Sequence, residues 1–593
     1  MNIYKDSQHC GVGPGAPLGR LLFGNLNNGA NYGRRYANLN NGLTNANWNY
    51  GARISDFNCV LCFAPPEGAC ESSLGRVPGI DEPASVKGQP GAGPMTEVWH
   101  GWGLVAHPKS LEFRKKAVMK TYCKDVNLAD KQFISNAIWG YMHDKKGNHQ
   151  LITFFSKWSG KTFKETRFLL KFACNHEYIS SLKKTGTSEE DAQKIYDAGY
   201  QFFMKVTDEI AAEMTANLVA RTVKEHIRKR SYQEKVIRYL EITDIGSGKR
   251  RDLGLECFLF RLYEAVSNAA ADPLFNAKVG EFQVASIKGK GQKYGKKAIS
   301  RWLSQDPEGT KIGCKADVKK CYPSIDHDRL RAMLHRDIHK SQQLVYLFDT
   351  IIDLYEEYPN PKSDDPKKGI LIGSPVSKDL CNYYMSVLYH YACEKLFKVK
   401  ARRGKEQRTR LISHIMIYMD DLQIYGSNKK DVQKAMELLV KFAADELLLT
   451  IKPNWRKFRS MYKNAAGKTC GCLLDFMGFR FHGGEVRQKN YFGRTVKYRE
   501  VWVTIRDTTF LKARRKFERF VRMVKRKQIV SYKFAKSLTS YFGCFKQTDS
   551  ATFRKDNKID QKMRIARRIV SDYAKGKPYQ TDKYYQMWRC KCA

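Results

Sequence analysis

The chain of 593 residues is 42% hydrophobic and 12% aromatic, which is enough apolar material for sizeable cores in about two to four domains. Its 104 Lys and Arg residues outnumber 60 Asp and Glu residues, and the formal net charge of +44 predicts a polyanionic partner such as nucleic acid. No run approaches the ~20 apolar residues of a transmembrane helix, and the first residues lack the apolar region of a signal peptide, so we expect an intracellular protein. A membrane surface is the weaker candidate partner, because the basic residues alternate with aromatic residues instead of flanking an apolar helix.

Residues 1–58 differ in composition from the rest of the chain. They are rich in Gly and Asn, and the sequence NLNNG occurs at 25–29 and again at 38–42. Asn and Gly favour turns and positive φ angles, and the segment has too few aliphatic residues for a core of its own. We expect a loop-rich, poorly ordered tail, followed at 59–107 by a linker rich in Pro and Gly.

The 16 cysteines have no regular spacing, which is typical of reduced thiols in the core of an intracellular protein. Cys59 and Cys62 form one CxxC motif, and Cys590 and Cys592 lie close together at the other end of the chain. Structural zinc takes four well-placed ligands, and nothing in the sequence brings these two pairs together. The sequence therefore favours cysteines that fill the core, with a zinc site as the minor alternative.

The pattern of the sequence changes at about residue 108. Apolar residues spaced three and four apart predict a helical region over 108–235, in which Thr187 and Glu190 have the spacing of a capping box. Strand patterns that begin near 238 predict a mixed α/β region over 236–505. The last segment, 506–593, begins with a basic helix whose apolar face is expected to consist of Leu511, Phe517, Phe520, Val521 and Val524.

The stretch IMIYMDDLQIYG at 415–426 places two adjacent aspartates, Asp420 and Asp421, between two apolar runs with high strand propensity. This pattern predicts a β-hairpin with the aspartates at its tip. Crowding two carboxylates at a poorly hydrated site is costly unless cations neutralise them, so divalent metal is the natural counter-charge. A solvated turn is the alternative for an isolated pair of aspartates, and the rest of the chain has to decide between the two.

A third carboxylate comes from CKADVKKCYPSIDHDRL at 314–330, where a short apolar strand ends in Asp317 and a turn at Pro323 precedes a helix. If this strand packs beside the hairpin, Asp317 and Asp420 face one another. Such carboxylates would bridge two metal ions about 3.5 to 4 Å apart, which activate a primer hydroxyl and stabilise a leaving pyrophosphate. Tyr322 would then lie under the sugar of an incoming nucleotide and clash with a 2′-hydroxyl.

Four motifs resemble those of reverse transcriptases, in the order of that family. They are DVKKCYPSI at 317–325, GILIGSPVSKDLCN at 369–382, YMDD at 418–421 and LLDFMGFRF at 473–481. The tetrapeptide YMDD alone is only moderately specific, but four motifs in order are far more so. The resemblance extends over roughly 230–550.

The resemblance implies an α/β (α+β) fold of the right-hand polymerase type, with fingers and palm in 236–505 and a helical thumb with a basic tail in 506–593. It implies an RNA-directed DNA polymerase, a nucleotidyltransferase that uses dNTPs and two Mg²⁺ ions, for which Mn²⁺ can substitute. The implied catalytic residues are Asp317, Asp420 and Asp421, and the implied metal site consists of Asp317, Val318, Asp420 and Asp421.

Further residues match the binding segments of the same family. The implied nucleotide-binding residues are Lys249, Arg250, Arg251, Tyr322, Ile372 and Gly373, with Tyr322 as the steric gate; for the basic run, a solvated charge cluster is the alternative. Lys452 and Lys457 are two candidates for the general acid that protonates pyrophosphate, and either is otherwise a solvated lysine. Nucleic-acid contacts are expected from a Gly- and Lys-rich segment beginning at Val284 and from the basic helix over 511–527, namely Lys288, Lys290, Lys293, Lys512, Arg514, Arg515, Lys516, Arg522, Lys525 and Arg526.

One motif departs from the commonest pattern. Many reverse transcriptases carry Gln at the position of Ile372, and loss of that amide is expected to loosen selection against mispairs. The apolar residue, together with SYFGCFKQTDS at 540–550, resembles the reverse transcriptases of diversity-generating retroelements, although Lys378 replaces their usual Gln. The implied activity is error-prone cDNA synthesis from a structured RNA that also primes it. A retron-like or antiphage defence reverse transcriptase and a non-catalytic RNA-binding protein are the alternatives.

The same resemblance gives residues 1–58 a second interpretation. Their Asn-rich repeats are similar to the lectin-type variable proteins that such elements diversify, so residues 1 to about 110 are either a genuine tail or translated template RNA, with the polymerase beginning near Met119. Expected partners are template RNA, the RNA–cDNA hybrid and dNTPs, with a basic accessory protein as a further candidate. The expected location is the cytoplasm, for a protein encoded by a bacterium or a phage.

Overall fold

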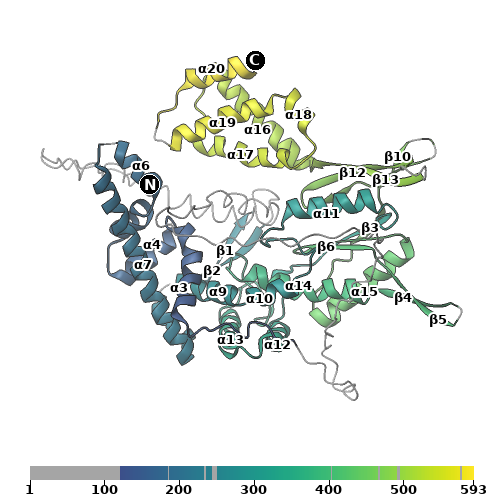
Figure 1. Cartoon of the computed structure of the whole chain (residues 1–593), viewed down its shortest axis with the longest axis horizontal. Coiled ribbons are helices and arrows are strands. Elements are labelled where there is room, and N and C mark those ends of the chain that lie inside the picture. The colour runs from purple at the N-terminus through teal and green to yellow at the C-terminus, as the bar shows by residue number, and fades with distance from the viewer. Residues whose placement is uncertain are drawn as a thin grey trace, which may run out of the picture.

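The structure is a computed structural model that describes residues 120–593 except 185, 233–234, 244–249, 403, 465, 467, 490–494, 575–576 and 593. The predicted tail at 1–58, the predicted linker at 59–107, and Cys59 and Cys62 lie outside the described residues. Figure 1 shows helices α3 to α7 on one side, a mixed region of helices and sheets in the middle, and a helical group, α16 to α20, at the C-terminal end. The fold is therefore mixed, with small antiparallel sheets among many helices.

The first described region is helical, as predicted. Its helices are α3 (Lys131–Met142), α4 (His149–Ser159), α5 (Phe163–Arg167), α6 (His176–Lys184), α7 (Glu189–Ala220) and α8 (Val223–Arg230), with the short elements η3 (His143–Lys145) and η4 (Phe168–Ala173). The N-cap of α7 is Ser188, whose side chain accepts a hydrogen bond from the backbone N–H of Asp191. The predicted capping box at Thr187 and Glu190 was therefore wrong by one residue, because both pairs have the same spacing.

A two-stranded hairpin and three helices follow. They are β1 (Ile237–Thr243), β2 (Arg250–Glu256), α9 (Phe258–Ala270), α10 (Asp272–Lys278) and α11 (Gln292–Gln305). Helix α9 is apolar around most of its circumference, which suits a helix surrounded by protein. It packs against α3, α4, α8, α10 and α13 (Gln342–Glu357). The N-terminal helices are thereby fixed to the middle of the molecule through α9.

The central sheet has the strand order β6-β7-β3-β8, and its neighbouring strands are antiparallel. Its strands are β3 (Ile312–Asp317), β6 (His414–Tyr418), β7 (Asp421–Gly426) and β8 (Arg456–Arg459). The predicted hairpin at 415–426 is confirmed as β6 and β7. Helices α14 (Ser377–Glu394) and α15 (Lys429–Leu447) pack against this sheet, and α12 (His327–Ile338) packs against α13.

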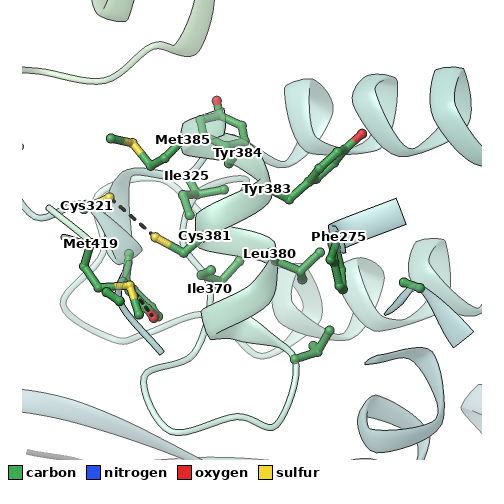
Figure 2. Close-up of a cluster of buried hydrophobic side chains, with 14 of the residues drawn as sticks. Phe275, Cys321, Ile325, Ile370, Leu380, Cys381, Tyr383, Tyr384, Met385 and Met419 are labelled. Carbon is green, nitrogen blue, oxygen red and sulfur yellow. Dashed lines mark hydrogen bonds between the residues drawn. The ribbon is translucent and has the colours of Figure 1, made fainter. Parts of the chain in front are cut away.

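A buried cluster around α14 supports the ends of the central strands (Figure 2). Cys321 and Cys381 are both buried there, with their Sγ atoms 3.7 Å apart, and Met419 lies at the same end of the helix. Cys321 precedes the short helical turn η5 (Tyr322–Ser324), and Met419 lies in the turn between β6 and β7. The cluster therefore fixes two turns that flank the candidate catalytic residues.

Three smaller sheets complete the strands. They are the hairpin of β4 (Phe397–Arg402) and β5 (Lys405–Arg410), the pair of β9 (Tyr462–Lys463) and β10 (Thr469–Cys470), and the sheet of β11 (Leu474–Phe476), β12 (Phe479–Lys489) and β13 (Thr495–Ile505). Strand β13 also packs against α11. The long hairpin of β12 and β13 leads into the C-terminal helices (Figure 1).

The C-terminal helices have a hydrophobic cluster of their own. They are α16 (Asp507–Lys525), α17 (Tyr532–Lys546), α18 (Ala551–Asp556), α19 (Ile559–Ala574) and α20 (Thr581–Cys592). On α16 the predicted apolar residues Phe517, Phe520 and Val524 are buried, whereas Leu511 is 46% exposed. Ala513 completes the buried stripe instead, since 513, 517, 520 and 524 follow the helical spacing of four, three and four residues.

Within the described part of the chain, no helix is long and apolar enough to cross a membrane.

Candidate active site

Two of the three candidate carboxylates are paired directly across the central sheet. Asp317 ends β3, Asp421 begins β7, and their Cα atoms are partners in the antiparallel register. Asp420, which was expected to face Asp317, lies in the turn and accepts a hydrogen bond at its carbonyl oxygen from the N–H of Val318 over 2.9 Å. The two carboxylates are close enough for the charge of Asp317 to raise the pKa of Asp420. In this turn Met419 has a positive φ of 56°, and Tyr418 pairs with Asp421.

The three carboxylates repel one another at a partly buried site. Burial, followed by the charges of Asp421 and Asp317, raises the pKa of Asp420 to about 7. Burial also raises the pKa of Asp421, although the positive charge of the nearby Lys315 lowers it. The side chains of Asp317 and Asp421 keep 30% and 31% of their surface exposed, so a ligand can reach them from solvent. Such a site favours a bound cation.

Two lysines partly neutralise the carboxylates. The Nζ of Lys452 forms an ion pair with Oδ2 of Asp317, and the Nζ of Lys315 lies 3.6 Å from Oδ1 of Asp421. Lys457, the second candidate general acid, lies on β8 opposite Cys314 and so is displaced along the sheet from Asp317. The structure thus brings Lys452, and not Lys457, to the carboxylates.

The residue types suit a hard divalent cation. Carboxylate oxygens are the ligands that Mg²⁺ and Mn²⁺ prefer. The raised pKa of Asp420 reflects burial first and then the charges of Asp421 and Asp317, whose repulsion a cation would relieve. In the side-chain positions described here, no three His, Cys, Asp or Glu residues converge closely enough to form a metal-binding group. Lys452 holds Asp317 in its present position, and a cation on that carboxylate would take the place of this ammonium group.

The candidate triphosphate residues lie on the β1–β2 hairpin. Arg251 lies close enough for its charge to lower the pKa of Asp420, against the larger effects of burial and the neighbouring carboxylates. Arg250 forms an ion pair of 3.3 Å with Glu241 across the hairpin and is well exposed. Lys249 lies outside the described residues. Of the predicted basic run, the structure therefore places Arg251 near the carboxylates.

Tyr322, Ile372 and Gly373 line one cavity of about 450 Å³, together with Met419. Tyr322 is buried, and its hydroxyl lies 3.8 Å from the sulfur of Met419. Gly373 has a φ of 106°, and a Cβ atom there would lie 2.9 Å from Cδ1 of Leu253 on β2. The structure thus brings these three predicted nucleotide-binding residues to a common space beside Asp420.

A sequence profile described as reverse transcriptase (RNA-dependent DNA polymerase) matches residues 227–495. The chain carries a reverse transcriptase domain. This match confirms the resemblance to the family, and the enzyme is a nucleotidyltransferase that acts on a nucleic-acid template and dNTPs. Reverse transcriptases generally use divalent metal ions. Among curated proteins, none matches the sequence.

The reverse transcriptase exposes some of the predicted nucleic-acid-binding residues and turns others inward. Lys288, in the loop before α11, and Lys293, in the first turn of that helix, are exposed. The Nζ of Lys290 instead donates hydrogen bonds to the carbonyl oxygens of Gly280 and Glu281. The side chain of Lys290 therefore stabilises the loop at Gly280 and Glu281 and does not point toward a ligand.

On helix α16, Arg514 and Lys525 are exposed although each has a protein partner. Lys512, Arg515, Arg522 and Arg526 are exposed. Arg514 forms an ion pair of 2.8 Å with Glu518, the Nζ of Lys516 lies 3.3 Å from the Ser537 hydroxyl, and the Nζ of Lys525 lies 4.8 Å from the centre of the Trp588 ring.

The sequence pattern did not single out two lysines of the reverse transcriptase. Lys315 precedes Asp317 by two residues, and the alternation of a strand places both on the same face, so this signal was available. Lys145 lines the cavity of Tyr322 from η3, outside the residues that match the family, and no motif pointed to it.

Proposed function

We propose that this reverse transcriptase makes error-prone cDNA copies of a structured RNA for a diversity-generating retroelement. The family match supports the general activity and does not distinguish between kinds of reverse transcriptase. The observation that supports the specific function is the apolar Ile372, which lines the same cavity as Tyr322 and Met419. An apolar side chain at this position offers no hydrogen bond to the nascent base pair, so geometric selection against mispairs is weaker.

The proposed arrangement is that of a right hand. The sheet β6-β7-β3-β8, with α14 and α15 packed against it, serves as the palm. The β1–β2 hairpin and the helices that follow serve as the fingers. The helices α16 to α20, with their separate hydrophobic cluster, serve as the thumb. The exposed cations of α16 would then follow the phosphate backbone of the template–primer duplex.

In the proposed reaction, the 3′-oxygen of the primer attacks the α-phosphorus of a dNTP, and the bond to the β-phosphate oxygen breaks. Asp317, Asp420 and Asp421, with the backbone of Val318, would hold two Mg²⁺ or Mn²⁺ ions, which activate the hydroxyl and stabilise the charge on the leaving group when bound. Arg251 would bind the triphosphate. Lys452 is the better placed of the two lysines to give a proton to the pyrophosphate.

Tyr322 is proposed to select deoxyribonucleotides. It is buried beside Met419, next to the turn that contains Asp420, so its ring has little room to move. A 2′-hydroxyl on the incoming sugar would have to displace this ring.

Sequencing of the cDNA tests the proposed function. The wild-type enzyme should give substitutions concentrated opposite template adenine, and Ile372→Gln should reduce their frequency while leaving total synthesis in place. Faithful cDNA from the wild-type enzyme, or untemplated repeats, would instead favour a retron-like or defence enzyme. An enzyme that binds RNA and makes no cDNA with Mg²⁺ or Mn²⁺ would contradict polymerase function altogether.

The second interpretation of the N-terminal segment has its own test. If residues 1 to about 110 are translated template RNA, the DNA beside the gene should contain a near-repeat of the segment that encodes residues 20–56. Mass spectrometry of the natively expressed protein should then find no peptides from residues 20–53. Detection of such peptides would show that the tail is part of the mature protein.

A further inference from the structure

The cavity beside Tyr322 has a second wall that lies only partly within the family motifs. This wall is made by Tyr141 and Lys145 of the N-terminal helical region, by Asn268 of α9, and by Ser377 and Lys378 at the start of α14. In Figure 1, α3 lies on the far side of α9 from the central sheet. The cavity therefore extends from the turn beside Asp420 towards helices that precede the family segment 227–495.

Two polar atoms of this wall are buried without a protein partner. The Ser377 side chain is 1% exposed, and neither its Oγ nor Oδ1 of Asn268 has a hydrogen-bond partner. The amide nitrogen of Asn268 interacts with Asp379, and this contact opposes the rise that burial causes in the pKa of Asp379. Unsatisfied buried polar atoms are costly, so their presence at a cavity indicates a ligand that completes them.

The same wall carries positive charge. The Nζ of Lys145 donates a hydrogen bond of 2.5 Å to the carbonyl oxygen of Tyr141 and lies 3.7 Å from the centre of the Tyr141 ring. Burial lowers the pKa of Lys145 to about 8, and the charges of Arg261 and Lys378 act in the same direction, against that of Asp144. Lys378 is exposed, and its Nζ lies 3.8 Å from the Asp379 carboxylate. Two lysines that repel one another across a cavity favour an anion between them.

We propose that this wall binds a template RNA nucleotide next to the templating base, with Lys145 and Lys378 contacting its phosphate and Ser377 and Asn268 contacting its polar atoms. The assignment rests on the proposed function, which places the primer end at the carboxylates and the new base pair along Ile372 and Gly373. The strand on the other side of that base pair is the template. The helices before the reverse transcriptase domain thus complete the path of the template strand.

The uncharged polar groups of Ser377 and Asn268 match the hydrogen-bonding groups of RNA. The Ser377 hydroxyl can donate a hydrogen bond to a phosphate oxygen, whereas Oδ1 of Asn268 can only accept one. A ribose 2′-hydroxyl supplies that donor and a deoxyribose does not. Asn268 is therefore assigned the recognition of the template as RNA.

The first experiment measures the affinity of the whole protein for a template–primer by fluorescence anisotropy, without dNTP, at several salt concentrations. Lys145→Gln and Lys378→Gln should each weaken binding several-fold and reduce the slope of log affinity against log salt by about 0.7 to 0.9. Lys145→Arg should restore binding. The matched control is Lys146→Gln, because the Nζ of Lys146 lies 4.8 Å from the centre of the Phe203 ring instead of lining the cavity.

A template with one uncharged methylphosphonate linkage locates the contact. Moving this linkage along the template should reveal one position that weakens binding of the wild-type protein and has no further effect on Lys145→Gln. Asn268→Ala should reduce the preference for an RNA template over a DNA template of the same sequence. All variants should retain the thermal stability of the wild-type protein within a few degrees.

Three results would overturn the proposal. The first is that Lys145→Gln and Lys146→Gln weaken binding equally. The second is that Lys145→Gln raises KM for dNTP while template affinity is unchanged, which would assign the wall to the triphosphate. The third is that the effects of the methylphosphonate and Lys145→Gln add at every position. The binding assays need no catalysis, so they remain informative if the wild-type protein makes no cDNA and the proposed function fails.

Discussion

Lys452 contacts Asp317 through both its side chain and its backbone. Its Nζ forms an ion pair with Oδ2 of Asp317, and its N–H donates a hydrogen bond of 2.9 Å to the carbonyl oxygen of the same residue. The backbone bond fixes the position of Lys452 at the end of β3 independently of the ion pair. The ammonium group can therefore leave the carboxylate for a ligand while the strand end stays intact.

This relationship predicts that the two candidate general acids differ in importance. Lys452→Ala should reduce the single-turnover rate of nucleotide addition by about 100-fold or more, because it would remove the proposed proton donor for pyrophosphate. Lys457→Ala should change the rate by less than about threefold, since Lys457 lies opposite Cys314. Rapid-quench kinetics with saturating dNTP measures both rates. If the two variants lost the same fraction of the single-turnover rate, the assignment of Lys452 as the general acid would be wrong.

The raised pKa of Asp420 predicts a pH-dependent stability of the metal-free protein. The pKa is about 7 in the folded protein against an ordinary 3.8, so between about pH 4 and pH 7 the folded state binds more protons than the unfolded state. The contribution of this group to stability therefore falls as pH rises through that window. At about pH 8 without metal, Asp420→Asn should melt at a higher temperature than the wild-type protein, by on the order of a few degrees.

Scanning calorimetry at several pH values measures this difference. Below about pH 4 the two proteins should melt at similar temperatures, since Asp420 is then protonated in both the folded and the unfolded state. Addition of Mg²⁺ at about pH 8 should stabilise the wild-type protein more than Asp420→Asn, because the cation relieves the repulsion. The prediction would be contradicted if the difference in melting temperature between the two proteins were the same at every pH.

Gly373 is predicted to be indispensable for the shape of the nucleotide cavity. Gly373→Ala forces a side chain into a φ of 106° and places a Cβ 2.9 Å from Cδ1 of Leu253. The matched control is Gly404→Ala, which has a φ of 70° with no atom within 4 Å of the added Cβ. Both should lose about 1 to 2 kcal/mol of stability from backbone strain. Only Gly373→Ala should raise KM for dNTP, by about 10-fold.

A second variant separates crowding from strain at Gly373. Leu253→Ala removes the atom that the new Cβ would contact, so the combination with Gly373→Ala should recover part of the lost dNTP affinity. Steady-state kinetics of primer extension measures KM in all four proteins. No recovery in the double variant would mean that backbone strain alone accounts for the loss.

The exposed arginines of α16 are predicted to bind phosphates. Arg515→Gln, Arg522→Gln and Arg526→Gln should each reduce the slope of log affinity for a template–primer duplex against log salt by about 0.7 to 0.9. Arg514→Gln should have a smaller effect, because Glu518 already partners Arg514. Anisotropy titrations between low and moderate salt measure the slopes. The assignment of α16 fails if binding is insensitive to salt or if all four substitutions act alike.

The sequence predicted the hairpin at 415–426 and the nearness of Asp317 to it, because strand patterns and motif order are local signals. It did not predict the register, in which Asp317 pairs with Asp421, because the register depends on the turn. Met419 adopts a positive φ, which is uncommon for a residue with a side chain, and nothing in the sequence predicts it.

Other features depend on contacts between residues far apart in the chain. Lys452 and Lys457 were equivalent in the sequence, and only the pairing of β8 with β3 separates them. Lys145 reaches the cavity because α3 packs on α9, which no periodicity reveals. By contrast, the exposure of Leu511 follows from helical geometry and was available from the spacing of the residues on α16.

The division of the apolar residues into two separate clusters has a mechanical consequence. The cluster of α16 to α20 begins at Ile505, and it is joined to the rest of the molecule by β13 and by polar bonds such as that from the Nζ of Lys296 to the carbonyl oxygen of Gln547. Polar bonds at a surface exchange with water at little net cost, whereas opening a hydrophobic core exposes apolar area. If the C-terminal helices serve as the proposed thumb, we expect them to move as one rigid unit about the end of β13, with both cores intact, as the duplex advances by one base pair.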